Sequence, residues 1–141
     1  MIPLDQTSFG ATAGNCFSAS VASILEMPLE DVPNFNPENW FNELNEWLPN
    51  YGLFALFFCK YDRPADWRLT WKALTDSVIC EAGVASPRYP GADHSVVFYK
   101  GVVIHDPHPD KASMSASLDD LRSLIVFVAI NPALAKIRKG E

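Results

Sequence analysis

Two apolar segments joined by Lys100–Gly101 constrain the fold of this chain more than any other sequence feature. The segments His94–Tyr99 and Val102–His105 are rich in β-branched and aromatic residues, which favour strands. A connection of only two residues between such segments is typical of a tight antiparallel hairpin. If the strands pair directly across this turn, His94 lies opposite Asp106, which follows the second strand. We therefore expect an imidazole and a carboxylate to be neighbours at the open end of the hairpin.

A helix is predicted further upstream, over Cys16–Leu25. Its apolar residues recur at helical spacing, and Asn15 stands where a side chain can cap the first turn. Small residues such as Ala19 and Ala22 favour close packing of this helix against a sheet. We expect the helix to end before Pro28.

The other segments show further helix and strand patterns. A second helix is expected from near Asn36, with Pro37 at its first position and Gly52 after its end. Its buried stripe is predicted to be Trp40, Phe41, Leu44, Trp47 and Leu48. Strands are predicted over Leu53–Tyr61, Val78–Val84 and Leu124–Ile130, a helical turn over Leu118–Leu124, and an ambiguous segment over Arg63–Thr75. This order predicts an α+β fold in which an N-terminal helix packs on an antiparallel sheet.

The composition fits one domain that spans residues 1–141. Hydrophobic residues make up 48% of the chain and charged residues 20%, which suits a single core and excludes a disordered chain. The net charge of −6 argues against a nucleic-acid partner, which the protein's field would repel. No apolar run approaches the roughly 20 residues of a membrane span, and no secretory signal pattern opens the chain. We expect a cytoplasmic protein without a membrane partner, and its oligomeric state stays open.

The three cysteines form neither a disulfide framework nor paired metal-binding motifs. This pattern favours free thiols in a reducing compartment. Cys59 follows two phenylalanines and Cys80 lies in a predicted strand, so both are expected in the core. Cys16 differs from them because it opens a predicted helix.

The start of a helix is a favourable place for a nucleophilic thiol. Its free backbone N–H groups and the positive end of the helix dipole stabilise a thiolate at Cys16. The Cys16 N–H can also face the oxygen of a substrate carbonyl, and Gln6 can supply a second donor from the loop upstream. His94 is the proton acceptor that the thiol needs, and Asp106 is the acceptor that orients its ring. The four residues together predict acyl chemistry at a cysteine.

The same four elements carry a family resemblance. The chain has Gln6, then Gly14-Asn15-Cys16-Phe17-Ser18-Ala19, then His94-Ser95-Val96-Val97, then Ile104-His105-Asp106-Pro107. These segments resemble the papain-like bacterial peptidases that process bacteriocin double-glycine leaders, and small phage and bacterial relatives of those peptidases. The resemblance covers the N-terminal segment and the hairpin, and it leaves the residues between them unassigned.

The resemblance implies a papain-like fold and a cysteine peptidase or amidase that works through an acyl-enzyme. It implies Cys16 as nucleophile, His94 as base, and Asp106 and Gln6 as supporting residues, with a peptide or protein substrate and no cofactor. The same residues would also serve a deamidase or an acyltransferase. A catalytically silent papain-like scaffold that binds another protein is the alternative from a different class. No fused transporter segment is present, so leader processing coupled to export is not implied.

Plainer interpretations accompany these residues. Cys16 could be a buried structural thiol, His94 a structural donor, Gln6 a solvated loop residue, and Asp106 a turn initiator before proline. The segment 105–110 resembles a set of metal ligands, but no second His/Cys cluster completes a coordination shell, so no metal is expected. His105 and His108 have no assigned role. The loop Gly83–Gly91 is expected to form one wall of the substrate cleft.

Overall fold

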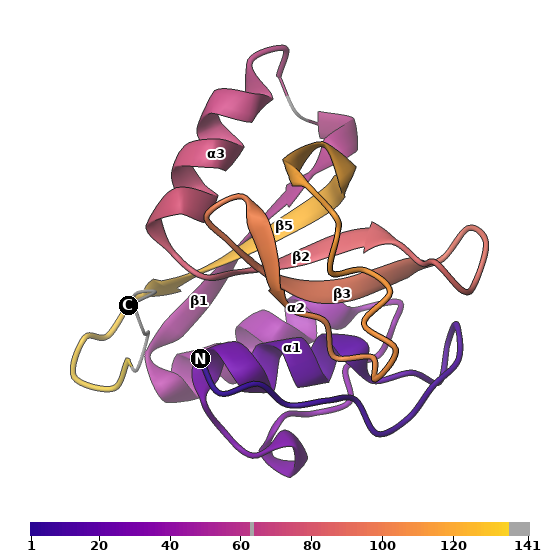
Figure 1. The fold of residues 1–141 in the computed structure, drawn as a ribbon. Helices are drawn as coiled ribbons and strands as arrows, with labels where there is room; N and C mark the ends of the chain where they lie inside the picture. The colour runs from indigo at the N-terminus through magenta and orange to yellow at the C-terminus, as the bar shows by residue number, and fades with distance from the viewer. Residues whose placement is uncertain (63, 136–141) are drawn as a thin grey trace.

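A computed structural model describes residues 1–62 and 64–135. One antiparallel sheet of five strands runs through its centre in the order β1-β5-β2-β3-β4 (Figure 1). The strands are β1 (Leu53–Cys59), β2 (Cys80–Ala85), β3 (Asp93–Tyr99), β4 (Val102–His105) and β5 (Leu121–Ala129). The helices are α1 (Cys16–Leu25), α2 (Trp40–Trp47) and α3 (Trp67–Ser77). The α+β prediction is therefore confirmed. No helix among the described residues combines the length and the apolar character needed to cross a bilayer.

Helix α1 has the predicted bounds, but its start is built differently from the prediction. Asn15 occupies the N-cap position without a capping hydrogen bond from its side chain. Its Oδ1 instead accepts the backbone N–H groups of Thr7 at 2.9 Å and Ser8 at 3.0 Å. The helix ends at Leu25, where Glu26 adopts the left-handed conformation with φ 55°. Asn15 thus links the N-terminal segment to the start of α1.

Helix α2 begins later than predicted, at Trp40 rather than near Asn36. The Asn36 side chain accepts the backbone N–H of Glu38 at 3.0 Å, and such a local bond competes with helix formation. A 3-10 turn over Leu48–Tyr51 follows α2 and ends at Gly52, where φ is 72°. The predicted stripe holds in part, because Leu44 and Leu48 are fully buried while the aromatic members are only partly buried.

Strand β1 ends at Cys59 instead of the predicted Tyr61, and it lies at the edge of the sheet. Its outward side chains are exposed, and Cys59 is half-buried rather than in the core. The Asn45 amide covers the free backbone edge by accepting the Ala55 N–H at 2.7 Å and donating to the Ala55 C=O at 3.0 Å. Cys80, in the inner strand β2, is fully buried as predicted.

The structure also settles the ambiguous and misplaced boundaries. Residue 63 lies outside the described residues. The rest of the ambiguous segment contains most of helix α3, on which Trp71 is buried. Strand β2 begins at Cys80 instead of Val78, and β5 begins at Leu121 instead of Leu124. The predicted helical turn is confined to Leu118–Asp120, because β5 begins directly after it.

The β3–β4 hairpin forms across Lys100 and Gly101, which both have positive φ, 51° and 82°. Positive φ at both positions is the conformation that matches the twist of a two-residue hairpin. Tyr99 pairs with Val102, and beyond a bulge Val97 pairs with His105. His94 is therefore not directly opposite Asp106 in the register, but the two side chains are neighbours as expected, with His94 Nε2 2.7 Å from Asp106 Oδ1. The turn and the bulge each displace the pairing.

The two faces of the sheet carry separate cores. Helices α1 and α2 cover one face and α3 covers the other (Figure 1). The face toward α1 includes Val97 and Ile125, and the face toward α3 includes Phe98 and Leu124. Glu81 points toward α1, since its cross-strand partners are Val97 and Ile125.

Candidate active site

A pocket opens where the N-terminal segment, the start of α1, the β2–β3 loop and the loop after β4 meet. Its walls include Gln6, Cys16, Arg88, His94 and His108. Ser86 and Tyr89 also line the pocket. Three residues of the loop that was predicted as one wall of the cleft, Ser86, Arg88 and Tyr89, therefore line the same pocket as the candidate nucleophile. The first residues of that predicted loop, 83–85, belong to strand β2 instead.

Cys16 is the first residue of α1 and is half-buried at the pocket wall. At this position its backbone N–H has no acceptor within the helix. The thiol therefore lies beside free backbone donors, as a nucleophile that develops negative charge requires.

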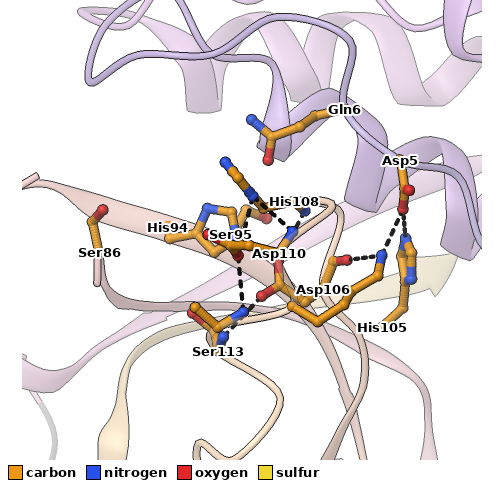
Figure 2. Close-up of polar contacts among 12 residues, drawn as sticks. Asp5, Gln6, Ser86, His94, Ser95, His105, Asp106, His108, Asp110 and Ser113 are labelled. Carbon is orange, nitrogen blue, oxygen red and sulfur yellow. Dashed lines mark hydrogen bonds and ion pairs between the residues drawn. The ribbon is translucent and has the colours of Figure 1, made fainter. Parts of the chain in front are cut away.

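His94 and Asp106 form a buried pair (Figure 2). His94 Nε2 lies 2.7 Å from Asp106 Oδ1, and the side chains are 5% and 0% exposed. Asp106 Oδ1 also accepts the backbone N–H of His108 at 2.9 Å, and Oδ2 accepts that of Ser113 at 2.9 Å. Burial raises the pKa of Asp106, but the hydrogen bonds from His94, Ser113 and His108 outweigh it and lower the pKa to about 2. Asp106 is thus an ionised acceptor held by three donors, which goes beyond initiating a turn.

The His94 ring binds this carboxylate and lines the same pocket as the Cys16 thiol. Burial lowers the pKa of His94, but hydrogen bonds to Asp106 and to the Cys16 side chain, together with their charges, raise the pKa to about 9. Because Nε2 faces Asp106, Nδ1 is the ring nitrogen left for the Cys16 thiol. The protonated ring is therefore the favoured form at neutral pH, and the imidazolium can stabilise a thiolate at Cys16.

Gln6 lies in the pocket wall with its backbone fixed. Its N–H donates to the Pro107 carbonyl at 2.9 Å, which joins the N-terminal segment to the Asp-Pro turn. Its side-chain Nε2 donates one hydrogen to the Ser8 carbonyl at 3.0 Å. The second Nε2 hydrogen remains for a ligand, so the predicted donor role is compatible with this position.

The two histidines without an assigned role differ from each other. His105 Nε2 donates to the Leu4 carbonyl at 2.8 Å, which ties β4 to the N-terminal segment. His108 lines the pocket, and its ring packs edge-on against Phe9 with centroids 5.2 Å apart. Within residues 1–62 and 64–135, no group of three or more His, Cys, Asp or Glu side chains is arranged to hold a metal ion.

Sequence reasoning missed a buried carboxyl group beside the site. Glu81 is 4% exposed, and Ser95 Oγ donates to its Oε1 at 2.7 Å. Burial is the main cause that raises the pKa of Glu81 to about 7, although the bond from Ser95 and the charge of His94 lower it. The available signal was a single acidic residue inside the apolar run 78–84, which marks a buried charge in need of a partner.

A larger hollow lies elsewhere on the surface, bounded in part by Lys60, Asp119 and Arg122. No cysteine or histidine is among its described lining residues. Nucleophilic chemistry therefore favours the smaller pocket at Cys16 over the larger hollow.

No family model, curated protein or solved structure matches this chain. The interpretation of the site therefore rests on its own geometry.

Proposed function

We propose that this protein is a papain-like cysteine hydrolase that cleaves an amide bond in a peptide or protein, with Cys16 as its nucleophile. One observation carries the proposal. His94 lies 2.7 Å from the buried carboxylate of Asp106 and lines the same pocket as the Cys16 thiol and Gln6. A nucleophile, a base and a group that orients the base are the minimum set for acyl transfer at a thiol.

In the reactive state His94 Nδ1 holds the proton of the Cys16 thiol, so that a thiolate faces the imidazolium. The thiolate attacks the substrate carbonyl carbon, and the developing oxyanion accepts hydrogen bonds from the Cys16 N–H and the second Nε2 hydrogen of Gln6. The imidazolium then protonates the leaving nitrogen as the C–N bond breaks, which leaves a thioester on Cys16. Water attacks the thioester while His94 takes its proton, and the acid is released with the thiol restored.

Asp106 acts through His94 in this scheme. Its Oδ1 fixes the ring so that Nδ1 faces the thiol, and its negative charge favours the imidazolium that forms in each half-reaction. The hydrogen bonds from His108 and Ser113 keep Asp106 ionised and oriented. The described cysteines are all free thiols, which supports action in a reducing compartment such as the cytoplasm.

Alkylation by iodoacetamide at neutral pH tests the proposal, with mass spectrometry to report each cysteine. We expect Cys16 to react at least about tenfold faster than the half-buried Cys59, because a thiolate paired with an imidazolium is the reactive species. In His94→Ala this advantage should disappear, while Cys59 should label at its original rate. Circular dichroism of each variant checks that the fold is retained.

The pH dependence gives a second readout, which uses hydrolysis of a peptide library. Activity should fall as the pH rises through about 9, because the His94 pKa of about 9 marks the loss of the imidazolium acid. In Asp106→Asn the alkaline limb should move to lower pH, since the carboxylate raises that pKa. A folded protein whose Cys16 labels no faster than Cys59 would instead be the silent scaffold. Release of ammonia without chain cleavage would identify a deamidase with the same residues.

A further inference from the structure

Two polar atoms on the Cys16 pocket walls have no partner within the described chain. The first is Gln6 Oε1, which is buried and receives no hydrogen bond from residues 1–62 or 64–135. Figure 2 shows this oxygen on the side of the Gln6 amide that faces His94 and His108. A buried acceptor without a donor is costly to the fold, so it indicates a donor that arrives with a ligand.

The second atom is Nε2 of His108. His108 Nδ1 lies 3.1 Å from both the Asp110 backbone N–H and the Asp110 Oδ1. When the backbone N–H donates to Nδ1, the ring carries its proton on Nε2, and the protonated ring carries a proton there as well. None of the hydrogen bonds found among the described residues uses this Nε2–H. The pocket therefore offers one free donor and one free acceptor next to the nucleophile.

The surrounding residues restrict the orientation of the His108 side chain, although it lies near the surface. Arg88 binds both Asp110 carboxylate oxygens, at 2.9 and 2.8 Å, and so fixes the residue whose N–H holds the His108 ring. The Phe9 ring packs edge-on against the imidazole, and the His108 backbone N–H is anchored on Asp106. The ring thus has one orientation relative to His94, whose centroid is 6.4 Å away. A fixed donor at this place loses little conformational entropy when it binds a ligand.

We propose that His108 and Gln6 together bind one amide unit of the substrate beside the scissile bond. His108 Nε2–H donates to the amide carbonyl, and Gln6 Oε1 accepts the amide N–H. This inference rests on the proposed function and extends it, because it assigns His108 a direct contact and selects peptide-like substrates over esters. An ester has no N–H for Gln6 Oε1, so that buried acceptor would stay unpaired. Arg88 and Asp110 are positioning residues, since they act through His108.

A matched pair of thiol probes tests the inference. An acetyl-dipeptide vinyl sulfone carries amide units, while methyl vinyl sulfone has the same reactive group and no amide. In both, the Cys16 thiolate forms an S–C bond to the β-carbon, and the α-carbon takes the proton from His94. The ratio of the two labelling rates therefore reports recognition of the amide, with the reactivity of the thiol divided out.

Two substitutions of His108 separate its donor from its packing. His108→Phe keeps an aromatic ring against Phe9 but removes the donor, and should lower the rate ratio about five- to tenfold, the value of one net hydrogen bond. His108→Gln keeps an N–H near the same position and should restore most of the ratio. A depsipeptide probe, with oxygen in place of the N–H nearest the vinyl group, should lose a similar factor on the unmodified protein.

An unchanged ratio in His108→Phe overturns the inference, and so does an equal slowing of both probes, which would place the effect on the thiol. The same experiment distinguishes failure of this inference from failure of the proposed function. If His94→Ala leaves labelling by methyl vinyl sulfone unchanged, Cys16 is not activated, yet the ratio still reports whether the pocket recognises an amide.

Discussion

The two faces of the central sheet differ in what they bury. The face toward α3 is mainly apolar, with Trp71, Phe98 and Leu124 at its centre. The face toward α1 also has an apolar core, but it encloses polar groups as well, among them Glu81 and Ser95. A buried polar group costs free energy unless it is paired, so the two faces contribute differently to stability. The α3 face contributes mainly apolar burial, whereas the α1 face also holds the buried carboxyl group of Glu81.

Buried side-chain atoms without a hydrogen-bond partner also distinguish the α1 side. Among the described residues, the buried side-chain atoms without a partner are Gln6 Oε1 and Ser20 Oγ, and both belong to the segments on the α1 side. Such atoms tend to occur at functional sites, where a ligand completes what the fold leaves open. The Gln6 atom lies at the pocket, while nothing in the structure explains the Ser20 atom.

The largest expected effect comes from truncating the apolar face. Phe98→Ala removes a fully buried ring and should lower the free energy of unfolding by about 3–5 kcal/mol in urea denaturation. The ratio of Cys16 to Cys59 alkylation rates should stay the same in the folded fraction. Phe54→Ala on the exposed side of β1 is the matched control and should cost less than about 1 kcal/mol. A loss of the Cys16 advantage in folded Phe98→Ala would show that the faces are not independent.

The second prediction concerns the buried carboxyl on the α1 face. The folded pKa of Glu81 is about 7, above its ordinary value of 4.5, mainly because the group is buried. The neutral form therefore stabilises the fold fully below about pH 4.5, and this contribution is lost as the pH rises through about 7. Glu81→Gln should remove this loss and gain on the order of 3 kcal/mol relative to the unmodified protein at pH 9.

Denaturation midpoints at pH 5 and pH 9 measure this effect. The exposed Glu38→Gln is the control and should follow the unmodified protein at both pH values. A Glu81→Gln variant with the same pH dependence as the unmodified protein would contradict the role given to this carboxyl.

The smallest expected effect concerns two asparagines whose side chains both bind the backbone of another segment. Asn15 binds the backbone of the Thr7–Ser8 segment near the pocket, and Asn45 binds Ala55 on the distant edge of β1. Each alanine variant should lose about 1 kcal/mol of stability, the value of lost local hydrogen bonds. Only Asn15→Ala should also slow labelling of Cys16 by the peptide probe, because it releases the segment that carries Gln6. Equal labelling in both variants would show that the pocket does not depend on this tie.

The sequence by itself determined the elements whose signals are local. The helix Cys16–Leu25 and the strand Val102–His105 have the predicted bounds, because apolar spacing and turn residues act over a few positions. The start of α2 was misplaced, since the Asx turn at Asn36 depends on local bonds that compete with a helix.

Only the tertiary structure decided how the candidate site is assembled. A bulge shifts the pairing of β3 and β4 from the expected register. His94 Nε2 still lies 2.7 Å from Asp106 Oδ1, and the Asp106 carboxylate also accepts a hydrogen bond from Ser113 in the following loop. The separate positions of His105 and His108, and the burial of Glu81, follow from contacts between segments distant in the chain. Sequence patterns report periodicity along the chain, whereas hydrogen bonds between remote segments depend on three-dimensional packing that no local pattern encodes.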